Sequence, residues 1–456
     1  MRKAILTDGP IASTLIKMAG GMIFGLAAMS AFNIVDTWFV SQLGKSELAA
    51  MSFIFPIVLL INSIALGLGI GISSVVSRAI GSGDHHKVQR LVTDGLLLAV
   101  SIVIVVSIFG ILTIRPLFSL LGADGNTLDL INKYMIIWYI GIPFVVIPMA
   151  GNNAIRATGD TFTPSIIMIV AVIANLSLDP LFIFGIGPFP KLGISGAALA
   201  TVIGRFITFT LSLSILGFRE KLILLKRPKM HEVLDSWKHI VFVGVPAAIV
   251  QIINPLSLGV ITRMLAGFSE DVVAGFGAAS KVERFILLIP MALSTAMTPF
   301  TGQNWGAGKV SRIIKGIRFS GIVSVVWGII MFVVMLFAAR PLTGLFSSGK
   351  TVIDSGSSYL KIVSISYGFL GIITLVGHSF SALNKPFHSG VIVLTRAFII
   401  YLPLAFLGSY ILQETGIFAA TLVTNILGGF IAFLYMIRFL KKKQKNPGII
   451  QTSFTE

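Results

Sequence analysis

The stretch SAFNIVDTWFV, residues 30–40, places Asp36 inside the first long apolar run of the sequence. A carboxylate at the middle of a membrane helix costs at least about 2.5 kcal/mol, so one that is kept there usually faces a polar cavity and acts on an ion or substrate. Asn33 precedes Asp36 by three residues and shares its helical face. The stretch therefore predicts a polar site inside a membrane helix.

The composition indicates a polytopic membrane protein. Hydrophobic residues make up 55% of the 456 residues and charged residues only 12%, about half the charged fraction of soluble domains. Cysteine is absent, which excludes disulfides and thiolate chemistry. The net charge of +17 is better explained by basic cytoplasmic loops than by nucleic-acid binding, which places a basic face on a soluble fold. We expect no nucleic-acid partner.

Twelve apolar segments are long enough to cross a bilayer, for which about 20 residues are needed. They lie at residues 12–41, 47–77, 88–113, 128–152, 161–185, 192–217, 238–264, 272–300, 311–337, 355–381, 388–411 and 415–438. The connections alternate between strongly basic and weakly basic along the whole chain. The positive-inside rule then places both termini in the cytoplasm. We expect a multi-pass protein of the plasma (inner) membrane of a prokaryote.

The chain contains an internal repeat. Gly81 aligns with Gly306 and Tyr134 with Tyr359 at one constant shift, and Thr201 aligns with Thr424 at a slightly shorter shift. The repeat predicts an all-α fold of two pseudo-symmetric six-helix bundles related as parallel repeats. The expected parts are an N-terminal lobe (1–217), a cytoplasmic linker (218–237) and a C-terminal lobe with a basic cytoplasmic tail (238–456).

Further polar residues share the first half with Asp36. Asn175 and Asp179 are four residues apart and share a helical face, and Thr201 follows small residues that permit close helix approach. We expect these four residues to converge on one hydrated pocket. Under the repeat, Asp36 aligns with Ile261 and Asp179 with Leu402, so the carboxylates are not required by the scaffold. Structural pairing of each Asp with a nearby polar group is the alternative.

Other positions are candidates for a substrate cavity or a hinge. The cavity candidates are Asn33, Tyr134, Tyr139, Asn153, Gln251, Lys281, Glu283 and Met291. Mutual neutralisation of Lys281, Glu283 and Arg284 is an alternative for those charges, and packing is the alternative for Met291. The hinge candidates are Gly20, Gly21, Pro180 and Pro246. No metal ligand cluster, catalytic residue or cofactor motif is expected.

Several local motifs together carry a family resemblance. They are Asn33 to Trp38 with Gly44, Tyr134 with Gly141-Ile-Pro143, Arg156 to Asp160 with Pro164, Asn175 to Pro180, Gly193 to Thr201, Gly244-Val-Pro246 and Gln303-Asn304-Trp305-Gly306-Ala-Gly308. With these motifs the chain resembles multidrug and toxic compound extrusion (MATE) transporters of the DinF-like branch over nearly its whole length. Several relatives carry proline where this chain has Gly21, although a glycine pair can also host a bend.

The resemblance implies a V-shaped pair of six-helix lobes that exports cationic or amphipathic compounds by antiport. It assigns coupling-ion binding to Asp36, Asn175, Asp179 and Thr201. We expect Asp36 to take a proton from outside, the cluster to rearrange and the substrate to leave; Na⁺ bound by the two carboxylates is the alternative. We expect a monomer in contact with membrane lipids. A lipid-linked precursor flippase, a channel and an enzyme are the less favoured classes.

Overall fold

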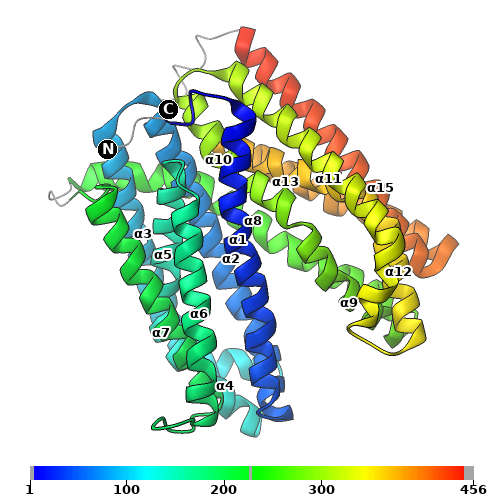
Figure 1. Ribbon diagram of the computed structural model, residues 1–456. Coiled ribbons are helices and arrows are strands. Elements are labelled where there is room, and N and C mark those ends of the chain that lie inside the picture. The colour runs from blue at the N-terminus through cyan, green and yellow to red at the C-terminus, as the bar shows by residue number, and fades with distance from the viewer. Residues whose placement is uncertain (1–4, 225–228, 446–456) are drawn as a thin grey trace. The chain divides into compact units, whose positions relative to one another are not determined.

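The computed structural model describes residues 5–224 and 229–445, without the side chains of Asn33, Ile34, Asp36, Thr37, Ser41 and Asn254. Every regular element in these ranges is helical, as Figure 1 shows. The helices before the linker are α1 (Ile11–Ser41), α2 (Lys45–Ser82), α3 (His85–Leu120), α4 (Gly125–Gly141), α5 (Pro143–Ala157), α6 (Phe162–Phe184), α7 (Ile194–Ser214) and the π-helical turn η1 (Ile215–Arg219). Those after it are α8 (Met230–Ala266), α9 (Glu270–Ile286), α10 (Leu288–Gly306), α11 (Val310–Gly344), α12 (Lys350–Val363), η2 (Ser364–Ser366), α13 (Tyr367–Ala382), α14 (Pro386–Leu394), η3 (Thr395–Tyr401) and α15 (Leu402–Lys445).

The helices account for the twelve predicted spans. In the described ranges, nine helical segments are long and apolar enough to cross a membrane, and two bent pairs, α4 with α5 and α9 with α10, raise the number to 11. The last segment, Pro386–Lys445, has 60 residues and is interrupted at Gln413, whose φ of 55° is not helical. Counting it as two spans gives the twelve of the sequence analysis.

The break at Gln413 is shaped by two glycines. A Cβ built on Gly416 would collide with the backbone carbonyl oxygen of Gly408, and a Cβ on Gly408 would collide with the carbonyl oxygen of Gly416. The two backbone segments that flank the break therefore approach too closely for any side chain. Two of the spans predicted from the sequence, 388–411 and 415–438, meet on either side of Gln413.

The chain groups into two compact units that are not continuous in sequence. Unit 1 contains residues 24–79 and 84–248, and unit 2 contains 5–23, 80–83 and 249–445. Helices α1 and α8 are thus each shared between the units, and the division falls after Ile23 in α1 and after Ala248 in α8. The lobes that the repeat predicts are continuous segments, 1–217 and 238–456. The two units group residues by their contacts in the structure, so each unit combines separate segments of the chain.

Helices α6 and α7 of unit 1 pack against each other, and Figure 1 shows them side by side. Small residues make this approach possible. A Cβ on Gly196 would collide with the carbonyl group of Phe182, and a Cβ on Gly204 would lie 3.4 Å from the Cβ of Asn175. Glycine at a helix interface lets two backbones pack closely within a membrane, and here it brings the polar residues of α6 against α7.

Candidate functional site

The polar cluster of unit 1 joins Asn175 and Asp179 of α6 to Thr201 of α7. With the Asn175 amide turned so that both of its ends are satisfied, Nδ2 donates to Asp179 Oδ2 at 2.8 Å and Oδ1 accepts from the backbone N–H of Thr201 at 3.1 Å. In the opposite orientation, Nδ2 donates to Thr201 Oγ1 at 3.3 Å. Either orientation places Asn175 between the other two residues, so the structure brings three of the four predicted coupling residues together.

The cluster is sealed from solvent on the Asp179 side. Asp179 is 0% exposed and Asn175 is 3% exposed, and both lie in a helix that is long and apolar enough to span a membrane. A carboxylate is rarely kept there without a functional reason. The side chain of Asp36 lies outside the described residues, and the structure therefore places only its backbone, in α1.

A partly open pocket of unit 1 adjoins the cluster. Its empty space of about 360 Å³ includes space that is open to solvent, and Asn175 and Thr201 contribute polar groups to its lining. The remaining lining residues are Met29, Phe32, Met168, Ala171, Val172, Gly204 and Arg205. Its walls are thus mostly apolar with a few polar groups, which is the usual make-up of a small-molecule site. Asn175 and Thr201 therefore border a shallow hollow that is mostly apolar.

Arg205 is a lining residue that the sequence analysis missed. It belongs to α7, one turn after Thr201, and its side chain is half-buried. An arginine inside a predicted span is rare enough to have been noticed from sequence alone. Its position adds a positive charge to the pocket beside Asn175 and Thr201.

The other unit 1 candidates lie outside the lining of this pocket. Tyr134 and Tyr139 of α4 are buried, and the ring of Tyr139 packs where a Cβ on Gly110 would be. Asn153 of α5 donates from Nδ2 to the Met149 carbonyl at 2.8 Å. These contacts describe helix packing, and Asn33 has its side chain outside the described residues. A substrate role for all four stays a prediction.

In unit 2 the predicted charges Lys281 and Glu283 contact different aromatic side chains. Lys281 is exposed and its Nζ lies 5.2 Å from the ring centroid of Phe346. Glu283 instead accepts a hydrogen bond of 2.9 Å from the hydroxyl of Tyr359. No ion pair joins Lys281, Glu283 and Arg284 among the described residues, although the charge of Arg284 acts on Glu283 from a distance, so mutual neutralisation stays an alternative for these two side chains.

The remaining candidates lie in helices α1, α6, α8 and α10. Gln251 of α8 is half-buried, and Met291 of α10 is 46% exposed. Gly20 of α1 has open space where a Cβ would lie. It and Gly21 precede the unit division at Ile23 by two or three residues, and Pro246 precedes the division at Ala248 by two. Pro180 lies within α6, which continues to Phe184. Their role as hinges stays a prediction.

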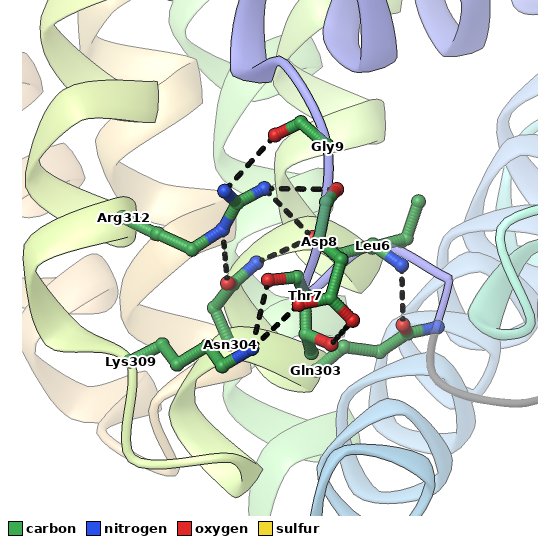
Figure 2. Close-up of polar contacts among 8 residues, drawn as sticks. All are labelled: Leu6, Thr7, Asp8, Gly9, Gln303, Asn304, Lys309 and Arg312. Atoms are coloured by element: carbon green, nitrogen blue, oxygen red, sulfur yellow. Dashed lines mark hydrogen bonds and ion pairs between the residues drawn. The ribbon is translucent and has the colours of Figure 1, made fainter.

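The Gln303-Asn304 motif at the end of α10 holds the segment that precedes α1. Figure 2 shows the contacts, all within unit 2. Gln303 Oε1 accepts from Leu6 N–H at 3.1 Å, and Asn304 Nδ2 donates to the Leu6 carbonyl at 3.1 Å. Lys309 forms an ion pair of 2.8 Å with Asp8, and the hydrogen bond and positive charge of Lys309 hold the pKa of Asp8 below its usual value. The motif thus anchors the start of α1.

The turn before α6 contains a second polar anchor, in unit 1. Asp160 accepts hydrogen bonds from Thr163 N–H at 3.0 Å and from its hydroxyl at 2.7 Å. Arg219 Nη2 lies 2.6 Å from Asp160 Oδ2. Burial works to raise the pKa of Asp160, but the bonds from Thr163 and Arg219 outweigh it and hold that pKa below its usual value. The negative charge of this carboxylate therefore stabilises the folded protein.

We expect Asp160→Asn to destabilise the protein at neutral pH by on the order of 1 kcal/mol. Because the folded-state pKa is lowered, the carboxylate stabilises the fold above the unfolded value of about 3.9, and this contribution disappears as pH falls through the folded pKa. Thermal unfolding in detergent between pH 7 and 3 measures it, with Asp129→Asn as the control, since its ion pair with Arg115 is exposed. A gap between wild type and Asp160→Asn that does not narrow at acid pH would contradict the prediction.

The family can be assigned from the sequence as a whole. The MatE family model matches residues 22–181 and again 246–407. The chain belongs to the MATE family. The starts of the two matches are separated by nearly the same length of chain as their ends, and this separation agrees with the repeat that aligns Tyr134 with Tyr359. MATE proteins are transporters, so this protein is a membrane transporter and not an enzyme.

Individual relatives extend the match to almost the full chain. An FAD transporter of Shewanella oneidensis is 40% identical over 94% of this chain and 95% of its own length. The probable multidrug resistance protein YoeA of Bacillus subtilis is 25% identical over 97% of this chain and 94% of its own. The multidrug export protein MepA of Staphylococcus aureus is 23% identical, covering 94% of each chain. The named cargoes of these MATE relatives differ.

Solved structures confirm the fold class. A crystal structure of a mutant of the Vibrio cholerae MATE transporter VcmN matches with a TM-score of 0.90 at 30% identity, covering 95% of this chain and 97% of that chain. VcmN in its bent form matches with a TM-score of 0.89, also at 30% identity, covering 94% and 98%. The all-α MATE fold predicted from the repeat and the motifs is therefore the fold of this chain.

Proposed function

We propose that this MATE transporter is a secondary active multidrug exporter of cationic or amphipathic compounds, driven by inward proton movement through the Asn175–Asp179–Thr201 cluster and Asp36. The observation that carries the proposal is Asp179, a fully buried carboxyl bonded to Asn175 at 2.8 Å beside a largely apolar pocket. A buried carboxyl can exchange a proton and thereby change its own charge, and that change shifts the affinity for a bound cation.

The hydrogen bonds of Asn175 support a proton over sodium as the coupling ion. Na⁺ is a hard cation that binds oxygen ligands. The Asn175 oxygen accepts the backbone N–H of Thr201, and its nitrogen faces Asp179. An amide nitrogen cannot bind a cation, so the Asn175 nitrogen occupies a position at Asp179 Oδ2 that a Na⁺ ion would need, while the Asn175 oxygen keeps one lone pair beside its bond to Thr201. Sodium remains the alternative ion.

The coupling ion can be tested with purified protein in proteoliposomes. We expect an imposed pH gradient to drive accumulation of a cationic dye without sodium, because Asp179 needs only a proton to lose its charge. Dye accumulation under a sodium gradient at equal pH on both sides measures the alternative. Transport that requires sodium and ignores the pH gradient would overturn proton coupling, and no transport under either gradient would overturn ion coupling.

The FAD transporter of Shewanella oneidensis favours a second candidate function, export of an anionic aromatic compound such as a flavin dinucleotide. At 40% identity that protein is far more similar to this chain than YoeA at 25%. A flavin dinucleotide is amphipathic but carries negative phosphates, so it needs positive groups along its path. Arg205 beside the unit 1 pocket and Arg396 in unit 2 are such groups.

The orientation of the chain also belongs to this proposal. The basic loops support both termini in the cytoplasm of a prokaryotic cell, with the protein in the inner membrane as a monomer surrounded by lipids. In this orientation, substrate enters from the cytoplasm and the driving proton enters from outside.

A further inference from the structure

Arg396 places a guanidinium deep inside a membrane span of unit 2. It lies in the π-helical segment η3. This segment directly follows α14, whose first residue is Pro386. At the rise of an α-helix, Arg396 is roughly 15 Å into the span, or about half of a hydrocarbon core of about 30 Å. Single π-helical turns within helices are frequently found at functional sites. In the repeat register that pairs Thr201 with Thr424, Arg396 aligns with Ile173, so the scaffold does not require this charge.

Neighbouring helices hold the Arg396 side chain in place. Its Nη2 donates to Asn425 Oδ1 at 2.7 Å, and Asn425 Nδ2 donates to Ser366 Oγ at 2.9 Å. Asn425 and Ser366 are 1% and 0% exposed. The Arg396 stem packs against Gly428, one turn after Asn425 in α15, since a Cβ there would be in ordinary contact with Arg396 Cγ at 3.6 Å. The guanidinium is therefore preorganised, which is what a binding group needs.

The charge of Arg396 has no direct counter-ion in the described ranges. No ion pair links it to a carboxylate there, and its buried Nε finds no acceptor among the described residues. The hydroxyl of Tyr367, which is 0% exposed, also has no hydrogen-bond partner in the described part of the chain. A buried polar group without a partner is destabilising, and more so when it is charged. The guanidinium therefore keeps one unused donor, its own Nε–H, and the Tyr367 hydroxyl of unit 2 is a second unused donor among the described residues.

Glu283 is the carboxylate that acts on this site from a distance. It interacts electrostatically with both Arg396 and Tyr367, and its Oε2 is held at 2.9 Å by the hydroxyl of Tyr359. Arg396 and Glu283 are both half-buried, so part of each residue stays exposed. Glu283 partly compensates the positive charge while it leaves the donors of Arg396 available.

We propose that Arg396 binds the phosphate, or an equivalent anionic group, of an aromatic substrate, and that this group replaces Glu283 as the counter-charge. A guanidinium with a free N–H matches the oxygen geometry of a phosphate. This role of Arg396 rests on the second candidate function, export of an anionic aromatic compound. Arg396 would be the residue that recognises the anionic group. Because Arg396 lies near mid-span, a lipid headgroup, which sits at the membrane surface, is the less suitable source of that phosphate.

Equilibrium binding to the purified full-length protein tests the proposal without any ion gradient. The probes are riboflavin, FMN and FAD, which share one ring system but differ in phosphate, measured by quenching of flavin fluorescence. We expect wild type to prefer FMN and FAD to riboflavin. Arg396→Gln should weaken FMN and FAD binding about tenfold or more and leave riboflavin within twofold.

Two further variants complete the test, one that should strengthen binding and one that serves as a control. Glu283→Gln should strengthen FMN and FAD binding about threefold or more, because it removes the competing charge and leaves the hydrogen bonds of Arg396 intact. This variant carries the test if Arg396→Gln is not monodisperse in detergent. Arg340→Gln is the matched control, since Arg340 is an arginine of unit 2 in an exposed ion pair with Asp354, and it should change FMN binding less than twofold.

Several results would overturn the proposal. These are equal binding of FMN and riboflavin by wild type, equal weakening of both by Arg396→Gln, and an effect of Arg340→Gln as large as that of Arg396→Gln. Loss of FMN binding in phosphatidylglycerol nanodiscs but not in phosphatidylcholine nanodiscs would assign Arg396 to a lipid phosphate and would also overturn it. The proton-coupling proposal is tested separately by the gradient experiment, so the two can fail independently.

Discussion

Asp179→Asn will abolish ion-driven export while leaving the protein folded. The carboxyl is fully buried in α6 and receives a hydrogen bond from Asn175. An amide of the same shape keeps an acceptor oxygen for that bond but cannot gain or lose a proton, so the cluster is fixed in its neutral state. We expect dye accumulation in proteoliposomes to fall to the level of protein-free vesicles, with an unchanged elution profile on size exclusion in detergent.

The control for Asp179→Asn is Asp129→Asn, which removes an equal charge from an exposed ion pair. We expect it to transport like wild type. Asp36→Asn should match Asp179→Asn if the two carboxyls form one coupling site, as the sequence predicts. Cells that carry Asp179→Asn and keep full drug resistance would refute the assignment of this cluster to ion coupling.

We expect Asn304→Leu to destabilise the protein strongly. Asn304 lies at the end of α10 and holds the segment that precedes α1. The Asn304 side chain is 0% exposed. It donates to the Leu6 carbonyl at 3.1 Å and to the Phe300 carbonyl at 2.8 Å, and its oxygen accepts from Arg312 Nε at 3.1 Å. Leucine fills a similar volume but makes none of these bonds. At about 1 kcal/mol for each bond, the loss is roughly 3 kcal/mol.

The thermal midpoint of the detergent-solubilised protein measures this effect. Ser52→Ala is the matched control, because its exposed hydroxyl bonds only to the Leu48 carbonyl of its own helix, and such surface changes stay within about 0.5 kcal/mol. A midpoint for Asn304→Leu equal to that of Ser52→Ala would show that the start of α1 does not depend on the contacts of Figure 2.

The fold was predictable because its signals are local or repeated. Each span is a continuous apolar run, and the repeat keeps its register over many positions of both halves. The site in unit 1 was predictable for a related reason. Asn175 and Asp179 share a face by their spacing of four, and Gly196 and Gly204 on either side of Thr201 permit the close contact of α6 with α7.

The contacts that the sequence did not reveal join residues far apart in the chain. The Gln303-Asn304 motif was recognised, but its partner Leu6 lies 297 residues away, and no helical period links them. Arg396 meets Asn425 only because a π-helical segment and α15 pack together. Arg205 is different, because an arginine within an apolar run is visible in sequence and was overlooked.

The division of α1 and α8 between the two units bears on how the protein can have arisen and how it can be dissected. Residues 5–23 belong to unit 2, and residues up to 248, beyond the linker, belong to unit 1. Each unit therefore includes the N-terminal part of a helix that is encoded in the other half of the gene. A fragment cut at the linker would lack part of its own interior, so neither half of the gene encodes a complete compact unit.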